Sequence, residues 1–125
     1  MWTVVKMQDT EILQGVLDRW QAGVDVHEPQ KVAGVFTEDA IFQGLRPYSV
    51  GREGVAEYYD SQPLGMTVSY EILETRRPTP ELVVGYVRAD FAFPDRATVS
   101  LNLGVVVTHS DAGWRILQYQ VSPQV

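Results

Sequence analysis

The first part of the chain carries apolar residues at helical spacing. Between residues 8 and 24 they recur in steps of three and four, at Leu13, Val16, Leu17, Trp20 and Val24. One such stripe predicts an amphipathic helix with a single buried face. Asp9 or Thr10 is expected to cap the start of this helix, because short polar side chains accept the first free backbone N–H groups.

Two shorter helices and one strand are predicted next. Pro29 suits the first turn of a second helix, and Gly34 keeps that helix short. Its buried side is expected to hold Val32, Ala33, Val35 and Phe36. Residues 37–39 are expected to break the helix, residues 40–43 to form a short strand, and residues 45–50 to form a loop. A third helix is predicted over residues 52–61, since Pro63 cannot continue it.

The second half of the chain alternates between apolar and polar residues. Four segments bounded by turn residues predict strands over residues 66–76, 82–93, 97–109 and 114–122. In the second of these, Val87, Ala89 and Phe91 share one face, and the residues between them share the other. Such short connections make antiparallel neighbours, and an apolar sheet face needs a cover. The sequence therefore predicts a single α+β domain over residues 1–125, with three N-terminal helices packed on a curved antiparallel sheet.

Composition narrows the classes of partner. The 125 residues include 10 Lys and Arg against 16 Asp and Glu, a formal net charge of -6, which disfavours nucleic acid. The lack of cysteine excludes disulfides, thiolate catalysis and cysteine-ligated metals. No segment reaches the roughly 18 consecutive apolar residues of a membrane helix, and residues 1–6 lack the pattern of a signal peptide. We therefore expect a cytoplasmic protein with no nucleic-acid or membrane partner.

Motifs for metals, nucleophilic catalysis and phosphates are weak. His27 and His109 are the two histidines, and their separation in sequence predicts no metal site. Ser110 and Asp111 directly follow His109, and three consecutive residues in a turn rarely converge on one point as a triad does. Residues 51–54 open a helix but lack the lysine of a phosphate loop and the three glycines of a dinucleotide site. No metal and no cofactor are expected.

Acid–base chemistry remains open, with Asp90 as the candidate base. A carboxylate in an apolar cleft has a raised pKa, which suits a general base near neutral pH. In the alternative interpretation Asp90 lies on the solvent face beside Arg88 and Tyr86, and the alternation of the strand favours this second position. The same alternation applies to Asn102 and Gln118.

Aromatic residues are numerous enough to line an apolar pocket in which the tyrosine hydroxyls are the polar groups. The candidate pocket residues are Trp20, Phe36, Phe42, Tyr48, Tyr58 and Tyr59, together with Asn102 and Gln118. Small-molecule sites combine apolar walls with a few placed polar groups, and a buried tyrosine hydroxyl needs a partner. The alternative is ordinary core packing in which the hydroxyls reach the surface.

Three segments carry a resemblance to a known family. They are residues 35–42 (VFTEDAIF), 50–59 (VGREGVAEYY) and 113–122 (GWRILQYQVS). They resemble the nuclear transport factor 2-like superfamily, and most of all its SnoaL-like branch, which includes the SgcJ/EcaC family. The resemblance implies a cystatin-like cone, in which a bent sheet wraps around a long first helix, with a pocket at the wide end and a homodimer through the sheet. The superfamily hosts cyclases, isomerases, dehydratases, hydrolases and binding domains, so the fold alone does not give the activity.

The catalytic residues of the ketosteroid isomerase-like members do not carry over. Where those enzymes have a base aspartate, this chain has Gln43-Gly44, and where they have a tyrosine it has Trp20. One of their oxyanion acids falls near Asn102, which is a neutral donor. SnoaL-type cyclases use an acid–base aspartate on a late strand, and the resemblance makes Asp90 the candidate for that role.

The expected function is the binding of an apolar or aromatic metabolite. In one interpretation the protein is a cofactor-independent acid–base enzyme of the polyketide cyclase or isomerase type. Asp90 is then the base, and Tyr59 or Tyr48 donates a hydrogen bond to a developing oxyanion. In the other it is a non-catalytic ligand-binding or accessory dimerisation module. A third interpretation makes the polar sheet face a dimer interface that includes Tyr86, Thr98, Asn102 and Gln118.

Overall fold

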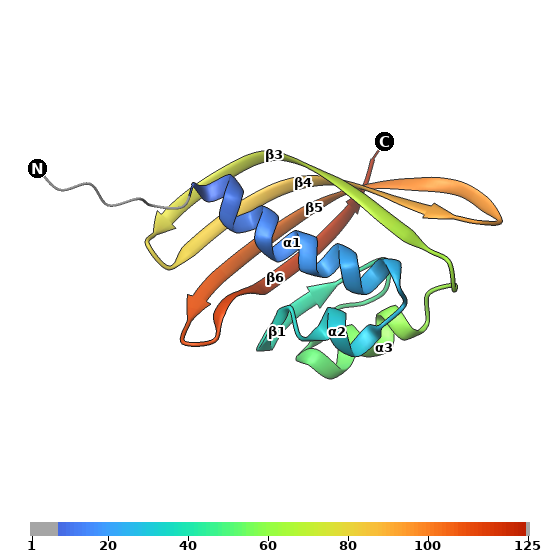
Figure 1. The fold of residues 1–125 in the computed structure, drawn as a ribbon, viewed down its shortest axis with the longest axis horizontal. Helices are drawn as coiled ribbons and strands as arrows, with labels where there is room; N and C mark the ends of the chain where they lie inside the picture. Colours follow the sequence, from blue (N-terminus) through green and yellow to red (C-terminus); the bar gives the residue numbers. More distant parts are fainter. Residues whose placement is uncertain (1–7, 125) are drawn as a thin grey trace, which may run out of the picture.

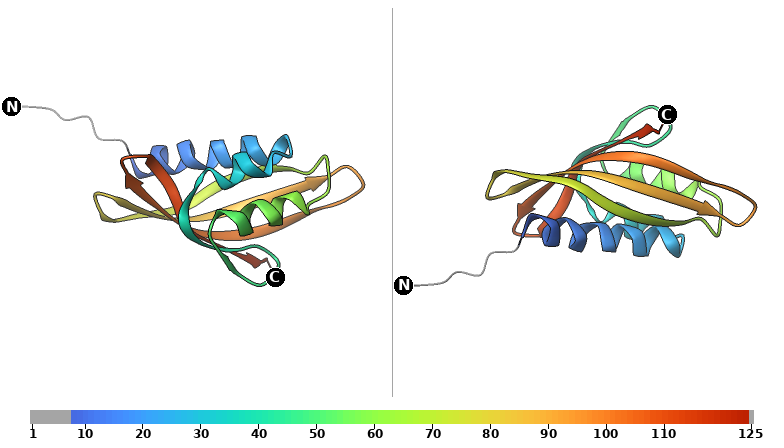
Figure 2. Two further views of the ribbon diagram at one scale, coloured as in Figure 1. Left: turned by 90° about the horizontal axis from the view of Figure 1, so that it is seen from below. Right: turned by 90° about the horizontal axis from the view of Figure 1, so that it is seen from above.

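Three helices lie on one side of a six-stranded sheet (Figures 1 and 2). The computed structural model describes residues 8–124. The helices are α1 (Asp9–Asp25), α2 (Pro29–Ala33) and α3 (Arg52–Asp60). The strands are β1 (Phe36–Gln43), β2 (Ser49–Val50), β3 (Thr67–Thr79), β4 (Leu82–Phe93), β5 (Arg96–Ser110) and β6 (Gly113–Pro123). The predicted α+β class, with N-terminal helices covering a curved sheet, is confirmed.

The sheet is mixed, which corrects the prediction of a purely antiparallel one. Its strand order is β2-β1-β6-β5-β4-β3, and β1 runs parallel to β6 while every other neighbouring pair is antiparallel. Short turns force the antiparallel pairs β3–β4, β4–β5 and β5–β6. No such turn joins β1 to β6, because α3 and four strands lie between them in the chain, so no local connection sets their relative direction.

Several boundaries differ from the predictions, and residues 49–50, which were expected in a loop, form the short strand β2 against β1. Helix α2 ends at Ala33, and β1 already begins at Phe36, so residues 37–39 extend the strand instead of forming a break. The backbone N–H of Ile116 donates to Val35 O at 2.9 Å, which draws this segment onto β6. Helix α1 is capped from Gln8, whose backbone N–H donates to the Glu11 carboxylate at 2.9 Å. This reciprocal cap replaces the expected one at Asp9 or Thr10.

Polar side chains on the outer flank of α1 hold it against the edge strand β3. Gln21 donates its side-chain amide to Val68 O at 2.7 Å, and the Asp25 carboxylate accepts the Val68 backbone N–H at 2.9 Å. The Tyr70 hydroxyl donates to the Asp18 carboxylate at 2.5 Å. These bonds occupy part of an otherwise open sheet edge and fix the helix over the inner face.

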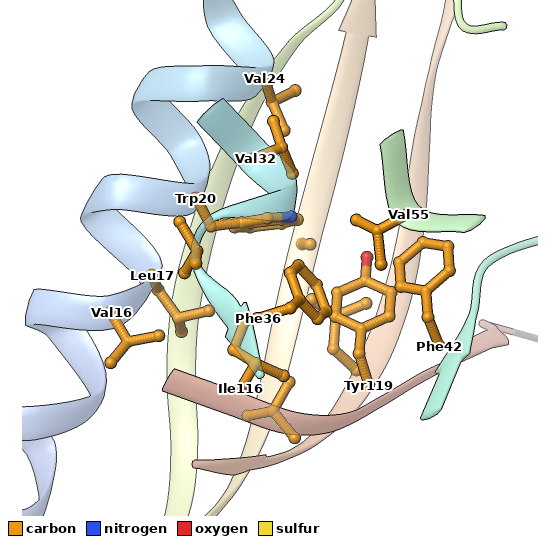
Figure 3. Packing of buried hydrophobic residues seen from close by; sticks show 14 of the residues in the cluster. Val16, Leu17, Trp20, Val24, Val32, Phe36, Phe42, Val55, Ile116 and Tyr119 are labelled. Carbon is orange, nitrogen blue, oxygen red and sulfur yellow. The ribbon is translucent and has the colours of Figure 1, made fainter. Parts of the chain in front are cut away.

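The strands divide cleanly into an inner and an outer face. On β4 the inner residues Val83, Val87 and Ala89 are fully buried, whereas Tyr86 and Arg88 are exposed. The inner face meets the apolar stripe of α1, and the largest buried side chains gather there (Figure 3). One residue, Leu117, has no partner on β5, and this bulge lets Ile116 and Tyr119 both point inward.

Within residues 8–124 no helix is both long and apolar enough to cross a membrane. The prediction that residues 1–6 form no signal peptide lies outside the described residues.

Candidate functional site

A small apolar cavity lies between α3 and the inner face of the sheet. Its volume is about 50 Å³. It is lined by Leu45, Tyr58, Tyr59, Gln62, Met66, Phe91, Phe93, Val99, Leu101, Tyr119 and Val121. The lining is mainly aliphatic and aromatic, and it contains no carboxylate, imidazole or cationic side chain. Such walls suit an apolar ligand.

A chain of hydrogen bonds runs from α1 to the wall of the cavity. The Trp20 indole N–H donates to the Tyr59 hydroxyl oxygen at 3.0 Å, and the Tyr59 and Tyr119 hydroxyl oxygens are 3.4 Å apart. Trp20 comes from α1, Tyr59 from α3 and Tyr119 from β6, so the three elements are joined at one point. Figure 3 shows the Tyr119 ring standing among Phe36, Phe42 and Val55.

These three side chains have more polar hydrogens than the two hydrogen bonds between them use. Trp20, Tyr59 and Tyr119 carry one polar hydrogen each, and the Tyr59–Tyr119 bond uses only one of the two hydroxyl hydrogens. Within residues 8–124 neither hydroxyl makes a further hydrogen bond. One O–H group therefore stays free to donate to an acceptor placed in the cavity.

Burial keeps both tyrosines neutral. Desolvation raises the pKa of Tyr59 far above its ordinary value of about 10, and its hydrogen bonds with Tyr119 and Trp20 only partly oppose this rise. Desolvation likewise raises the pKa of Tyr119, and the proximity of Tyr59 adds to the rise. At neutral pH the pair is thus a neutral hydrogen-bond donor and not a base.

The mouth of the cavity is formed by movable side chains. Leu45 and Val99 line it and are 58% and 37% exposed. Leu45 lies between β1 and β2, and its backbone N–H donates to the Tyr58 hydroxyl at 3.2 Å. Pockets for drug-sized ligands measure about 300–1,000 Å³, so this cavity admits only a small ring or chain end unless Leu45 turns away.

The structure brings five of the predicted pocket residues into one aromatic cluster. Trp20, Phe36, Phe42, Tyr58 and Tyr59 all lie on the inner side of the sheet. The Phe42 ring centroid is 5.6 Å from that of Phe36, 5.1 Å from that of Tyr58 and 5.7 Å from that of Tyr59. Tyr58 and Tyr59 line the cavity directly, whereas the other three stand behind its wall.

Three predicted pocket residues lie elsewhere. Tyr48 is 66% exposed in the loop before β2. Asn102 and Gln118 lie on the outer face of β5 and β6, opposite the cavity, because each alternates with an inward neighbour. The Asn102 side-chain oxygen accepts a hydrogen bond from Gln124 at 3.1 Å, and Gln118 borders a groove on that face. Their role in binding stays a prediction that these positions do not favour.

Asp90 also lies on the outer face. Its carboxylate accepts the Ser100 hydroxyl at 2.5 Å and lies 3.4 Å from the Arg88 guanidinium. The hydrogen bond from Ser100, together with the charge of Arg88, holds the pKa of Asp90 below its ordinary value. A base for neutral pH needs the opposite shift. The catalytic role of Asp90 therefore stays a prediction that neither its place nor its pKa favours.

The residue that sequence reasoning undervalued is Tyr119. It stands 4.9 Å from Phe42, ring centroid to ring centroid, in a stacked arrangement, and it completes the hydroxyl pair. Strict alternation cannot bury both Ile116 and Tyr119, and only the bulge at Leu117 makes that arrangement. Phe91 and Leu101 carried a usable signal, because both fall on the apolar side of their alternating strands.

No cluster of three or more His, Asp or Glu side chains suited to a metal ion occurs among residues 8–124. His27 lies in the turn between α1 and α2, and His109 packs against Trp114 with 5.1 Å between ring centroids.

Comparison with known proteins identifies the fold but not the activity. No protein-family model matches the sequence, and no curated protein matches it either. The solved structures similar to it include a Nostoc punctiforme domain of unknown function with a cystatin-like fold. It has 18% identity and a TM-score of 0.83, over 97% of this chain and 80% of that one.

Two further structures have names that suggest enzymes. A candidate scytalone dehydratase from Novosphingobium aromaticivorans has 12% identity and a TM-score of 0.77, over 94% of this chain and 85% of that one. A ketosteroid isomerase-like protein from Erwinia carotovora has 17% identity and a TM-score of 0.75, over 96% and 99%. The cystatin-like fold expected from the resemblance is thus confirmed. Assignment to the SnoaL-like branch stays a prediction.

Proposed function

We propose that this protein, which has a cystatin-like fold, binds a small apolar or aromatic molecule that carries one hydrogen-bond acceptor. The observation that carries the proposal is the unused O–H of the Tyr59–Tyr119 pair beside an apolar cavity. A buried donor without an acceptor is costly, by about 1–3 kcal/mol, and a ligand carbonyl or ether oxygen removes that cost. The ligand body then fills the space between Phe91, Leu101 and Val121.

Of the two functions that the sequence left open, the non-catalytic one is favoured. The titratable groups that line the cavity are Tyr58, Tyr59 and Tyr119. The raised pKa values of Tyr59 and Tyr119 keep these two side chains protonated near neutral pH. General acid–base turnover needs a group that exchanges protons near the working pH. The neutral tyrosines instead provide recognition, and they polarise an acceptor without accepting its proton.

The test uses two probes of similar shape, acetophenone, which has a carbonyl oxygen, and ethylbenzene, which lacks one. The Trp20 indole N–H signal in a ¹H–¹⁵N spectrum reports on the site, because Trp20 donates to Tyr59. Acetophenone is expected to shift this signal saturably. Ethylbenzene is expected to bind several-fold more weakly, as the loss of one hydrogen bond worth about 1 kcal/mol requires.

Two variants complete the test. The double variant Tyr59→Phe/Tyr119→Phe removes both hydroxyls while keeping the rings, so the preference for acetophenone is expected to disappear. Tyr48→Phe is the matched control, because Tyr48 is exposed and away from the cavity, and it should leave the preference unchanged. Equal binding of the two probes by the unaltered protein would refute the donor role. No shift of the Trp20 signal with either probe at millimolar concentration would refute the cavity as a binding site.

A further inference from the structure

The basic side chains of the protein differ in whether a carboxylate balances them. Within residues 8–124, ion pairs with Asp or Glu are formed by Lys31, Arg52, Arg76, Arg77, Arg88 and Arg96. Three described arginines form none, and these are Arg19, Arg46 and Arg115. Acidic side chains are in excess, with 16 Asp and Glu against 10 Lys and Arg, so an arginine without a carboxylate partner is unexpected here.

Two of the three unpaired arginines lie close together, between α1 and the start of β6. Arg19 on α1 donates from Nη2 to Trp114 O at 2.7 Å. Arg115, the next residue along β6, donates from Nε to Gly34 O at 3.1 Å and from Nη1 to Ala112 O. Bonds to backbone oxygens, and not to carboxylates, therefore hold both guanidinium groups in place.

The two positive charges face each other without an opposite charge to balance them. Partial burial and the charge of Arg115 both lower the pKa of Arg19, whereas a neighbouring carboxylate would raise it. A guanidinium group has five N–H donors, and Arg19 and Arg115 each use two of them in hydrogen bonds to the backbone. The remaining donors are free for the bidentate contacts that arginine makes with carboxylate and phosphate groups.

Gly15 leaves space beside this arginine pair. The Arg19 Nε–H group donates to Gly15 O at 3.3 Å, one turn back along α1. A Cβ atom added at Gly15 meets nothing within 4 Å among the described residues, so internal packing does not require a glycine there. A longer side chain at this position would reach toward Arg19, because residues four apart are neighbours on a helix surface. The glycine therefore keeps one side of the Arg19 guanidinium open.

We infer that Arg19 and Arg115 form a binding site for the phosphate or carboxylate group of a small anionic ligand. An oxyanion between the two guanidinium groups accepts hydrogen bonds from both and neutralises their repulsion. The ligand is small because the chain has a net charge of -6, which repels a polyanion such as nucleic acid. The inference is independent of the ligand-binding proposal, because neither arginine lines the apolar cavity.

The experiment titrates the protein with inorganic phosphate and follows the arginine Nε–H signals in a ¹H–¹⁵N spectrum. Both Nε–H groups donate to backbone oxygens, which slows their exchange with water. Phosphate at millimolar concentration is expected to shift the Arg19 and Arg115 signals saturably, whereas sodium chloride of the same ionic strength should not. Acetate is the second probe. Tighter binding of phosphate than of acetate would identify a phosphorylated ligand, and the reverse order would identify a carboxylate.

Gly15→Glu tests the site without removing an arginine. It places a carboxylate four residues before Arg19, which is the favoured order for an ion pair on a helix. This internal carboxylate should occupy the site and raise the dissociation constant of phosphate by about tenfold or more. Gly15→Gln is the matched control, because it has the same size without the charge, and it should bind phosphate as the unaltered chain does. Both variants replace a helical glycine that has open space around it, so both should fold.

Arg115→Gln removes one of the two guanidinium groups. It should also raise the dissociation constant of phosphate by about tenfold or more, measured at the Arg19 signal. Arg46→Gln is its control, because Arg46 is equally unpaired but borders a separate hollow beside α3, and it should leave phosphate binding unchanged. The inference would be overturned if neither phosphate nor acetate shifted the two signals more than sodium chloride does. Equal affinity for phosphate in Gly15→Glu and Gly15→Gln would overturn it as well.

Discussion

On its inner face, strand β4 buries Val83, Val87 and Ala89 completely, whereas on its outer face Tyr86 and Arg88 of the same strand remain exposed. The inner face is closed by α1 and α3 and leaves a cavity of only about 50 Å³. The outer face has a groove of about 400 Å³ and no covering element among residues 8–124. The difference teaches that the larger space is not the better candidate for a ligand site, because the lining of the smaller one includes buried tyrosines.

The largest effect is expected from shortening an inner aromatic side chain. Trp20 is 0% exposed, contacts Tyr119 and Phe91, and donates to Tyr59. Trp20→Ala should lower the free energy of unfolding by about 3–5 kcal/mol, because it opens a cavity and removes a buried donor. Urea denaturation monitored by circular dichroism measures this loss.

Tyr86→Ala is the outer-face counterpart of that variant. It should lower the free energy of unfolding by less than about 1 kcal/mol, because the ring is half exposed. If Trp20→Ala and Tyr86→Ala lowered the free energy of unfolding equally, the inner and outer faces would not differ in packing as described.

Two neighbouring glycines give a closer comparison. A Cβ at Gly85 would lie 2.3 Å from Leu13 Cδ2 and 3.2 Å from Val105 Cγ2, so Gly85→Ala forces the buried Leu13 side chain to move within the packed core. The expected cost is about 1–3 kcal/mol, as for other overpacked cores. Gly104→Ala has open space and should be neutral or stabilising by up to about 1 kcal/mol, because glycine weakens a strand. Thermal unfolding of the two variants measures these changes in stability. A larger loss for Gly104→Ala than for Gly85→Ala would contradict the assignment of Gly85 to the inner face and Gly104 to the outer face.

Alkaline pH should destabilise the protein through the inner tyrosines. Burial raises the pKa values of Tyr59 and Tyr119 in the folded state, whereas the unfolded chain releases these protons near pH 10. Their contribution to stability is complete below that pH and falls as pH rises above it, by about 1.4 kcal/mol per pH unit for each group. Partial burial and the Asp18 contact also raise the pKa of Tyr70, which adds to the loss.

Urea denaturation between pH 9 and pH 11 measures this slope. Removing one inner hydroxyl in Tyr59→Phe should make the slope shallower, whereas Tyr48→Phe, on the exposed loop, should leave it unchanged. An equal slope in the unaltered chain and in Tyr59→Phe would mean that Tyr59 ionises as freely in the folded state as in the unfolded one.

The sequence predicts which side chains point inward only where a strand is regular. Alternation along β4 and β5 placed Val87, Phe91 and Leu101 inward correctly, because side-chain direction in a regular strand depends only on parity. It could not place Tyr119, because the bulge at Leu117 is set by how β6 fits β5. The parallel pairing of β1 with β6 was equally hidden, since no local turn specifies it.

For the candidate site, the type of a residue predicted its place in the aromatic cluster better than its position in the sequence did. Trp20, Phe42 and Tyr59 meet in one cluster because large aromatic side chains are drawn into the single core. Tyr48 belongs to the same residue type but is exposed, which the loop expected over residues 45–50 already favoured, since loops run over the surface. The pairing of the Tyr59 and Tyr119 hydroxyls depends on three elements meeting in space, which no spacing in the chain records.

The smallest effect is expected at Asp90, and it tests whether the outer face carries chemistry. Asp90→Asn loses the charge that pairs with Arg88, and an exposed pair of this kind contributes at most about 1 kcal/mol. The pKa of Asp90 is lowered in the folded state, so its contribution is present above the unfolded pKa of about 3.9 and disappears as pH falls through the folded value. The difference in unfolding free energy between the variant and the unaltered chain should therefore vanish in acid.

Asp95→Asn is the control for Asp90→Asn, because Asp95 also pairs with an arginine, Arg96, but lies in the turn between β4 and β5. Both variants should bind acetophenone as the unaltered chain does, since neither carboxylate reaches the cavity. Weaker binding in Asp90→Asn alone would mean that Asp90 acts on the ligand across the sheet. That result would revive the acid–base interpretation, and it would make the outer face part of the site.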